Sequence, residues 1–149
     1  MSRRDSREAA FKVIFQYEFR KKPAEELVED YFNDIEDFEE EIKKESGKLE
    51  KDYILEVVKG TLEHRDEFLA LIDKTVTDWK LERVFKVEIA ILTMAMYEMF
   101  YKDDIPVGVA INEAVDIAKK YGREESGKFV NGVLGTIYRE KTGSEEVKS

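Results

Sequence analysis

One stretch of this chain, residues 84–100, is apolar on nearly every side of a helix. Its sequence is VFKVEIAILTMAMYEMF, in which the only charged residues are Lys86, Glu88 and Glu98. A helix that is apolar all round lies either at the centre of a protein core or in a membrane. Because this stretch carries charges and is short for a bilayer, we expect a central helix in a helical core.

Apolar residues recur at helical spacing along most of the remaining chain. The pattern predicts helices over residues 1–21, from Pro23 to about Ile35, from Leu49 to Val76 with a bend near His64, and over two segments between Ile105 and Tyr138. No strand pattern competes with these helices. The sequence therefore predicts an all-α fold of about seven helices in two packed groups.

The last two predicted helices have clear boundary residues. Pro106 suits the first turn of one helix, and Gly122 suits a left-handed residue that ends it. Ser126 is the expected N-cap of the other helix.

Three glycines, Gly127, Gly132 and Gly135, fall in that final helix, where glycine is unfavourable. Close helix packing is the expected reason for Gly132 and Gly135. For Gly127 we expect a surface that a partner's backbone or phosphate approaches.

The charge of the chain is unevenly distributed. A formal net charge of −9 argues against a general nucleic-acid coat protein. The first 22 residues carry seven basic and three acidic side chains, a balance of +4, whereas the other 127 carry 18 and 31, a balance of −13. A basic start on an acidic body can hold an RNA locally while repelling it elsewhere.

Length and composition favour one compact domain over residues 1–149, with a basic segment at 1–7 and a polar tail at 140–149. Cysteine is absent, which fits a cytoplasmic location, and no apolar run is long enough to cross a membrane. The lone His64 and the acidic run from Glu36 to Glu45 lack metal-site spacing, so neither a metal nor another cofactor is expected.

An enzymatic role is not indicated. The run GREESGKF at 122–129 has part of the spacing of a phosphate-binding loop, but Phe129 replaces the hydroxyl that would bind magnesium. No combination of serine, histidine and carboxylate suggests catalysis, so the sequence favours a binding protein.

Arg3, Arg4 and Arg7, at or before the start of the first helix, could adapt to a phosphate backbone. Lys128, with the N–H groups that begin the final helix, could form a second anion site.

The segments DIPVGVAINEAVDIAKKYG and SGKFVNGVL, in this order, resemble the NusB transcription antitermination factors. The run FVNGVL, from Phe129 to Leu134, is the most specific part, and the resemblance extends from about Arg3 to Arg139. It implies two three-helix bundles. It also implies binding of single-stranded boxA RNA from ribosomal RNA operon leaders, together with the small ribosomal protein NusE, other Nus factors and RNA polymerase.

The resemblance also implies roles for individual residues. The arginine-rich start, Arg3, Arg4 and Arg7, would be a main RNA contact. Phe129 would be an RNA-contacting aromatic, although its helical spacing also favours the core. The remaining implied positions are Glu125 beside the RNA and Glu82 and Glu88 near NusE. One departure is Thr93, where the family commonly has arginine.

Two other interpretations remain open. The chain could be a helical protein-binding adaptor without RNA binding, or a NusB-like module that places the substrate of a ribosomal RNA methyltransferase. No methyl-donor domain follows in this sequence, which favours a free-standing factor. Periodicity does not distinguish a monomer from a homodimer.

Overall fold

The structure is a computed structural model that describes residues 3–36, 49–76 and 83–143. These residues form seven helices and no strand, which confirms the predicted all-α class. The chain divides into two compact units, Met1–Leu62 and Glu63–Ser149, each of which is described by itself. The predicted acidic loop beyond Glu36, the partner position Glu82 and the end of the polar tail lie outside the described residues.

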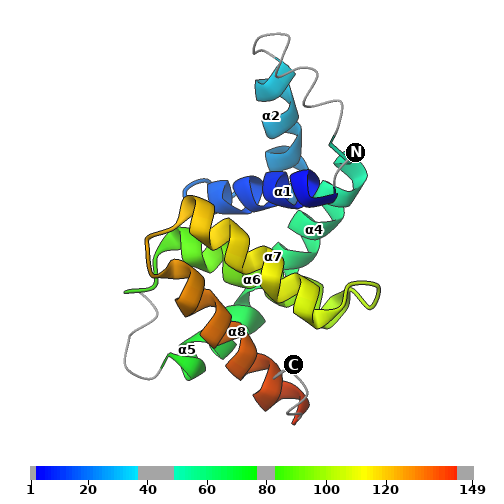
Figure 1. The fold of residues 1–149 in the computed structure, drawn as a ribbon. Coiled ribbons are helices and arrows are strands. Elements are labelled where there is room, and N and C mark those ends of the chain that lie inside the picture. The colour runs from blue at the N-terminus through cyan, green and yellow to red at the C-terminus, as the bar shows by residue number, and fades with distance from the viewer. Residues whose placement is uncertain (1–2, 37–48, 77–82, 144–149) are drawn as a thin grey trace. The chain divides into compact units, whose positions relative to one another are not determined.

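The first unit contains α1 (Arg3–Tyr17), α2 (Ala24–Glu36) and all but the last residue of α4 (Lys51–Glu63) (Figure 1). Each helix buries one apolar face, as its spacing predicts. The fully buried side chains include Ala10, Val13, Ile14, Leu27, Val28, Ile54, Val57 and Val58. Pro23 directly precedes α2, as expected for a residue that suits a helix start.

The second unit contains α5 (Arg65–Thr75), α6 (Lys86–Tyr101), α7 (Val107–Tyr121) and α8 (Ser126–Thr142). The predicted central helix is confirmed: every residue of α6 from Glu88 to Met99 is buried. It packs against α5, α7 and α8, and α7 also packs along α8 (Figure 1). The described helices therefore divide into a group of three and a group of four.

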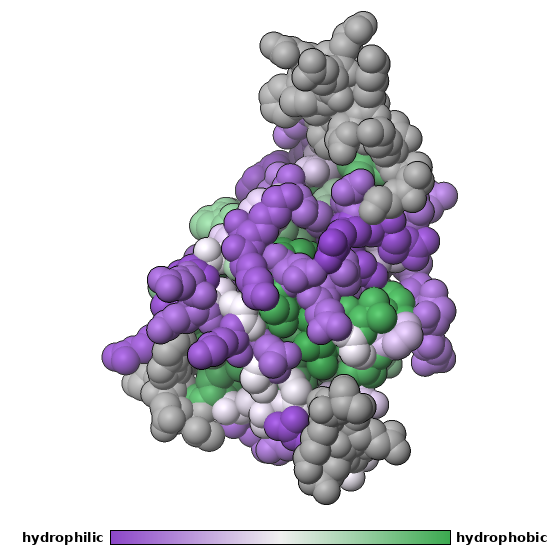
Figure 2. All heavy atoms as spheres, in the orientation of Figure 1, coloured by the Kyte–Doolittle hydropathy of each residue, from purple (hydrophilic) through white to green (hydrophobic). Residues whose placement is uncertain are grey.

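A helix boundary lies at His64, where the bend is predicted, because α4 ends at Glu63 and α5 begins at Arg65. Asp66 lies inside the first turn of α5. None of the described helices is long and apolar enough to span a membrane. Figure 2 shows hydrophilic side chains over most of the described part of one face, with hydrophobic side chains visible between them.

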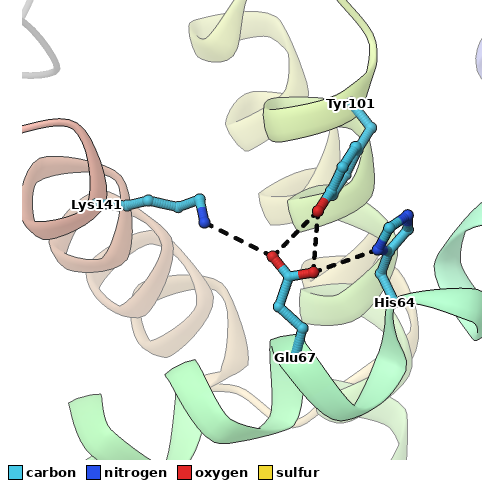
Figure 3. Close-up of polar contacts among 4 residues, drawn as sticks. All are labelled: His64, Glu67, Tyr101 and Lys141. Carbon is cyan, nitrogen blue, oxygen red and sulfur yellow. Dashed lines mark hydrogen bonds and ion pairs between the residues drawn. The ribbon is translucent and has the colours of Figure 1, made fainter.

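A carboxylate on α5 links three helices of the second unit. The Tyr101 hydroxyl, at the end of α6, donates to both oxygens of Glu67, at 2.9 and 3.1 Å. Lys141 Nζ from α8 lies 3.6 Å from the same carboxylate. His64 Nδ1 lies 3.2 Å from it, and the His64 ring stacks on Tyr101 with 4.0 Å between centroids (Figure 3).

These contacts change the acidity of Glu67. Partial burial raises its pKa, but hydrogen bonds from Tyr101 and His64 and the charge of Lys141 outweigh burial, so the pKa lies below its ordinary value of 4.5. The hydrogen bond to Glu67 raises the pKa of Tyr101. Because the pKa of Glu67 is lower in the folded state, its ionised form stabilises the fold above pH 4.5. That contribution is lost as the pH falls through the folded-state pKa.

We therefore expect Glu67→Gln to lower the free energy of unfolding at neutral pH and to have a diminishing effect as the pH falls below 4.5. The effect should be modest because the carboxylate is partly exposed. Urea unfolding at a series of pH values measures it. In a Tyr101→Phe background, which lacks the donor hydroxyl, the pH-dependent part of the effect should shrink; an undiminished effect would contradict this assignment.

Candidate nucleic-acid interface

The turn between α7 and α8 is shaped by one close approach. Gly122 follows Tyr121 with φ −94° and ψ −163°, an extended conformation, so the predicted left-handed cap is wrong. A Cβ at this position would lie 2.6 Å from Ser126 Oγ and 2.8 Å from the Ala118 carbonyl oxygen. Glycine is therefore required here by lack of space.

A fully buried carboxylate fixes the same turn to the start of α6. Glu88 is 0% exposed, and its Oε2 accepts a hydrogen bond of 2.7 Å from the Ser126 hydroxyl. Ser126 Oγ in turn accepts a 2.9 Å hydrogen bond from the backbone N–H of Arg123. The other carboxylate oxygen of Glu88 accepts from the backbone N–H of Phe85, 3.2 Å away, at the start of its own helix.

Arg123 completes this arrangement. Its Nη2 lies 3.3 Å from Glu88 Oε2, and its guanidinium carbon lies 4.1 Å above the centre of the Phe85 ring. The side chain of Arg123 remains 38% exposed. The prediction that Glu88 lies on a partner surface is wrong, because its side chain is fully buried and reaches no solvent. Ser126 is a buried link to Glu88 rather than the N-cap, which is Glu125.

The start of α8 presents three of the predicted RNA residues. Glu125 and Lys128 are exposed and Phe129 is half-buried, whereas Ser126 and Gly127 are buried between them. Half-burial leaves Phe129 able both to pack and to offer part of its ring to a ligand.

Two of the glycine predictions for this helix are wrong. A Cβ at Gly127 would lie 3.2 Å from Cγ of Lys119 on α7, so close packing explains it rather than a partner's approach. Gly132 has open space where a Cβ would project, so helix packing does not explain it. Gly135 is buried, as its packing prediction expects.

The other predicted RNA residues belong to the first unit. The helix α1 already includes Arg3, so all three arginines lie within it and none precedes it. Arg3 and Arg4 are exposed, but Arg7 is only 5% exposed, which contradicts its prediction as a free phosphate grip. Arg3 forms an ion pair of 2.9 Å with Glu50.

Thr93 lies in the buried part of α6 and is only 1% exposed. Its hydroxyl donates to the carbonyl oxygens of Ile89 and Ala90, at 2.8 and 3.2 Å. The position therefore offers no surface contact, and helix backbone satisfies its polar group.

Sequence reasoning missed two contributors. Arg123 lies in the run GREESGKF, but its contact with Phe85 joins residues far apart in the chain. Glu50 follows the acidic run and gave no sequence indication of its pairing with Arg3. Among the described residues, no group of three or more metal-ligating side chains could hold a metal ion.

In this all-α protein, the N-terminus of α8 thus carries a cation, Lys128, and an aromatic ring, Phe129. The buried carboxylate of Glu88 supports it.

The family model described as the NusB family matches residues 4–139. The transcription antitermination protein NusB of Acetivibrio thermocellus is 44% identical over 146 residues, covering 98% of this chain and 94% of its own length. The protein of the same name from Agathobacter rectalis is 46% identical over 134 residues, covering 90% and 97%.

The solved structures agree. NusB of T. maritima matches with a TM-score of 0.77 at 35% identity, covering 94% of this chain and 92% of that one. A chain from a crystal structure of antitermination factors NusB and NusE with double-stranded RNA matches with a TM-score of 0.74 at 26% identity, covering 93% and 96%. This chain belongs to the NusB family. The family is non-enzymatic, which confirms the prediction from the sequence that the chain is not an enzyme.

We expect Glu88→Gln to destabilise the fold by about 1–3 kcal/mol, because an amide N–H₂ would face donors that now share a carboxylate. Chemical denaturation measures the change. Glu140→Gln, on the exposed face of α8, is the matched control and should stay within about 0.5 kcal/mol of the parent. Equal small effects of the two substitutions would contradict the importance of the buried carboxylate.

Two glycine substitutions should have opposite effects on stability. Gly122→Ala should cost about 1–3 kcal/mol, because its Cβ would overlap Ser126 and a backbone carbonyl. Gly132→Ala should stabilise by roughly 0.5–1 kcal/mol, because alanine favours the helix and space is open. Thermal unfolding of both variants tests this, and a tolerated Gly122→Ala would show that the turn can move.

Proposed function

We propose that this chain is a transcription antitermination factor that binds the unpaired boxA RNA of ribosomal RNA operon leaders together with NusE. Family membership supports the antitermination role, and both relatives described above carry that name. The NusB neighbour solved with NusE and RNA supports both classes of partner. Other Nus factors and RNA polymerase in the cytoplasm complete the proposed complex.

The observation that carries the proposal is the start of α8. Exposed Lys128 and half-buried Phe129 are adjacent in a first helical turn that is fixed to α6 through Ser126 and Glu88. A helix N-terminus favours anions, lysine pairs with phosphate, and an aromatic face stacks with an unpaired base. Unpaired bases are the usual target of sequence-specific RNA recognition.

The start of α1, in the first unit, supplies a further set of cations. Arg3 and Arg4 are exposed cations in the part of the chain that carries net positive charge. We assign phosphate contacts to these two, and none to the buried Arg7. Exposed Glu125 lies three residues before Lys128 and would weaken RNA binding by repulsion, which favours the RNA that makes the most other contacts.

So few phosphate contacts make a cooperating protein necessary for tight binding. Three phosphate contacts to a single strand give a salt slope of only about −2. A second protein bound to the same RNA raises the effective concentration of each binder. Glu82, which lies outside the described residues, remains a predicted NusE contact.

We expect Lys128→Ala to weaken boxA RNA binding by about 1 kcal/mol, roughly fivefold, and to reduce the salt slope by about 0.7, because one phosphate contact is lost. Fluorescence polarisation with labelled RNA, in the presence of NusE, measures both quantities. Lys59→Ala, which removes an exposed cation on α4, is the matched control and should change neither.

A scrambled RNA of equal length and composition tests the function itself. The proposal requires boxA to bind more tightly than the scrambled RNA when NusE is present. Equal affinity for the two RNAs would refute boxA recognition and would favour the adaptor interpretation.

A further inference from the structure

The guanidinium of Arg3 is engaged on two sides within the first unit. Its Nε donates to Glu50 Oε2 at 3.0 Å, and its Nη2 lies 2.9 Å from the same oxygen. Its guanidinium carbon lies 4.0 Å above the centre of the Tyr53 ring. Glu50 thus occupies an edge of the group that a phosphate would use, while Tyr53 supports its face.

Glu50 is held in place through its backbone. Its N–H donates to Ser6 Oγ at 3.0 Å, and Ser6 is fully buried on α1. Its carbonyl oxygen accepts from the N–H of Ile54 at 2.9 Å, so Glu50 directly precedes α4. A carboxylate is favourable at a helix N-terminus. The position of Glu50 therefore does not depend on its pairing with Arg3.

We propose that Glu50 competes with RNA phosphate for Arg3 and so lowers the affinity of this chain for RNA; the proposal rests on the RNA-binding function proposed above. Carboxylate and phosphate oxygens accept from a guanidinium with similar geometry. A phosphate that binds at the edge of the Arg3 guanidinium that faces Glu50 must displace the Glu50 carboxylate. The Tyr53 ring orients the guanidinium in both states.

The exposure of the pair permits this exchange. The side chains of Arg3 and Glu50 are 48% and 31% exposed, and exposed ion pairs are weak. An RNA phosphate can therefore replace the carboxylate at a modest cost in affinity. That cost applies to every RNA that uses Arg3, so only an RNA with further contacts, such as those proposed at α8, binds well.

A double-mutant cycle tests the competition. Glu50→Gln should tighten RNA binding roughly two- to fivefold, the size expected for loss of an exposed ion pair. In an Arg3→Ala background the same substitution should give no gain, because the contested cation is absent. The gain should also decrease as salt rises, since screening weakens the pair. Fluorescence polarisation with boxA and scrambled RNA measures all four proteins.

Glu29→Gln is the matched control. Glu29 is an exposed carboxylate of the same unit that pairs with Lys51, so its loss changes the net charge equally. If Glu29→Gln tightens binding as much as Glu50→Gln, or if the Glu50→Gln gain persists without Arg3, the effect is general electrostatics and the competition is refuted. No gain from Glu50→Gln in a protein whose thermal unfolding is unchanged would also refute it.

The same data separate the two proposals. Equal affinity for boxA and scrambled RNA refutes boxA recognition, yet an Arg3-dependent gain on either RNA still supports the competition. If boxA is preferred but the gain is absent, the function stands and the competition is refuted. If neither RNA binds any of the proteins, both are refuted.

Discussion

The buried carboxylate of Glu88 is the contact on which the arrangement of the candidate interface depends. A carboxylate that loses all exposure is costly unless donors surround it. Here the donors come from the start of its own helix, from Ser126 and from Arg123. Because two of these donors belong to the turn that begins α8, the charge can be satisfied only when that turn lies against α6. The position of Lys128 and Phe129 within the second unit follows from this contact.

The same contact explains why two positions of the turn carry the residue types that they do. Ser126 must be small and must both donate and accept, since it joins Glu88 to the Arg123 backbone. Gly122 must lack a side chain because Ser126 occupies the space. A chain that turns this tightly can begin a new helix within a few residues, which leaves the first turn of α8 in a defined position for an anion.

The sequence predicted the helices well because their apolar spacing reports burial directly. The apolar residues of α6, and the break at His64, were apparent from pattern alone. The burial of charged residues is harder to predict, because spacing does not distinguish a solvated carboxylate from a buried one that accepts hydrogen bonds. Glu88 and Glu98 are two of the three charged residues in the stretch 84–100, and both are buried. Glu88 accepts from the backbone N–H three residues before it, but the residue there is Phe85 and not one of the types that mark a capping box in a sequence.

Contacts between distant parts of the chain explain the remaining differences. The pairing of Arg3 with Glu50 joins residues 47 positions apart, and no local pattern contains it. Composition gave only the sum of charges near the first helix. In an acidic chain, however, the effect of a cation depends on the carboxylate beside it. An arginine with a neighbouring carboxylate binds anions weakly and selectively, which suits the proposed role of a factor that acts with a second protein on one RNA.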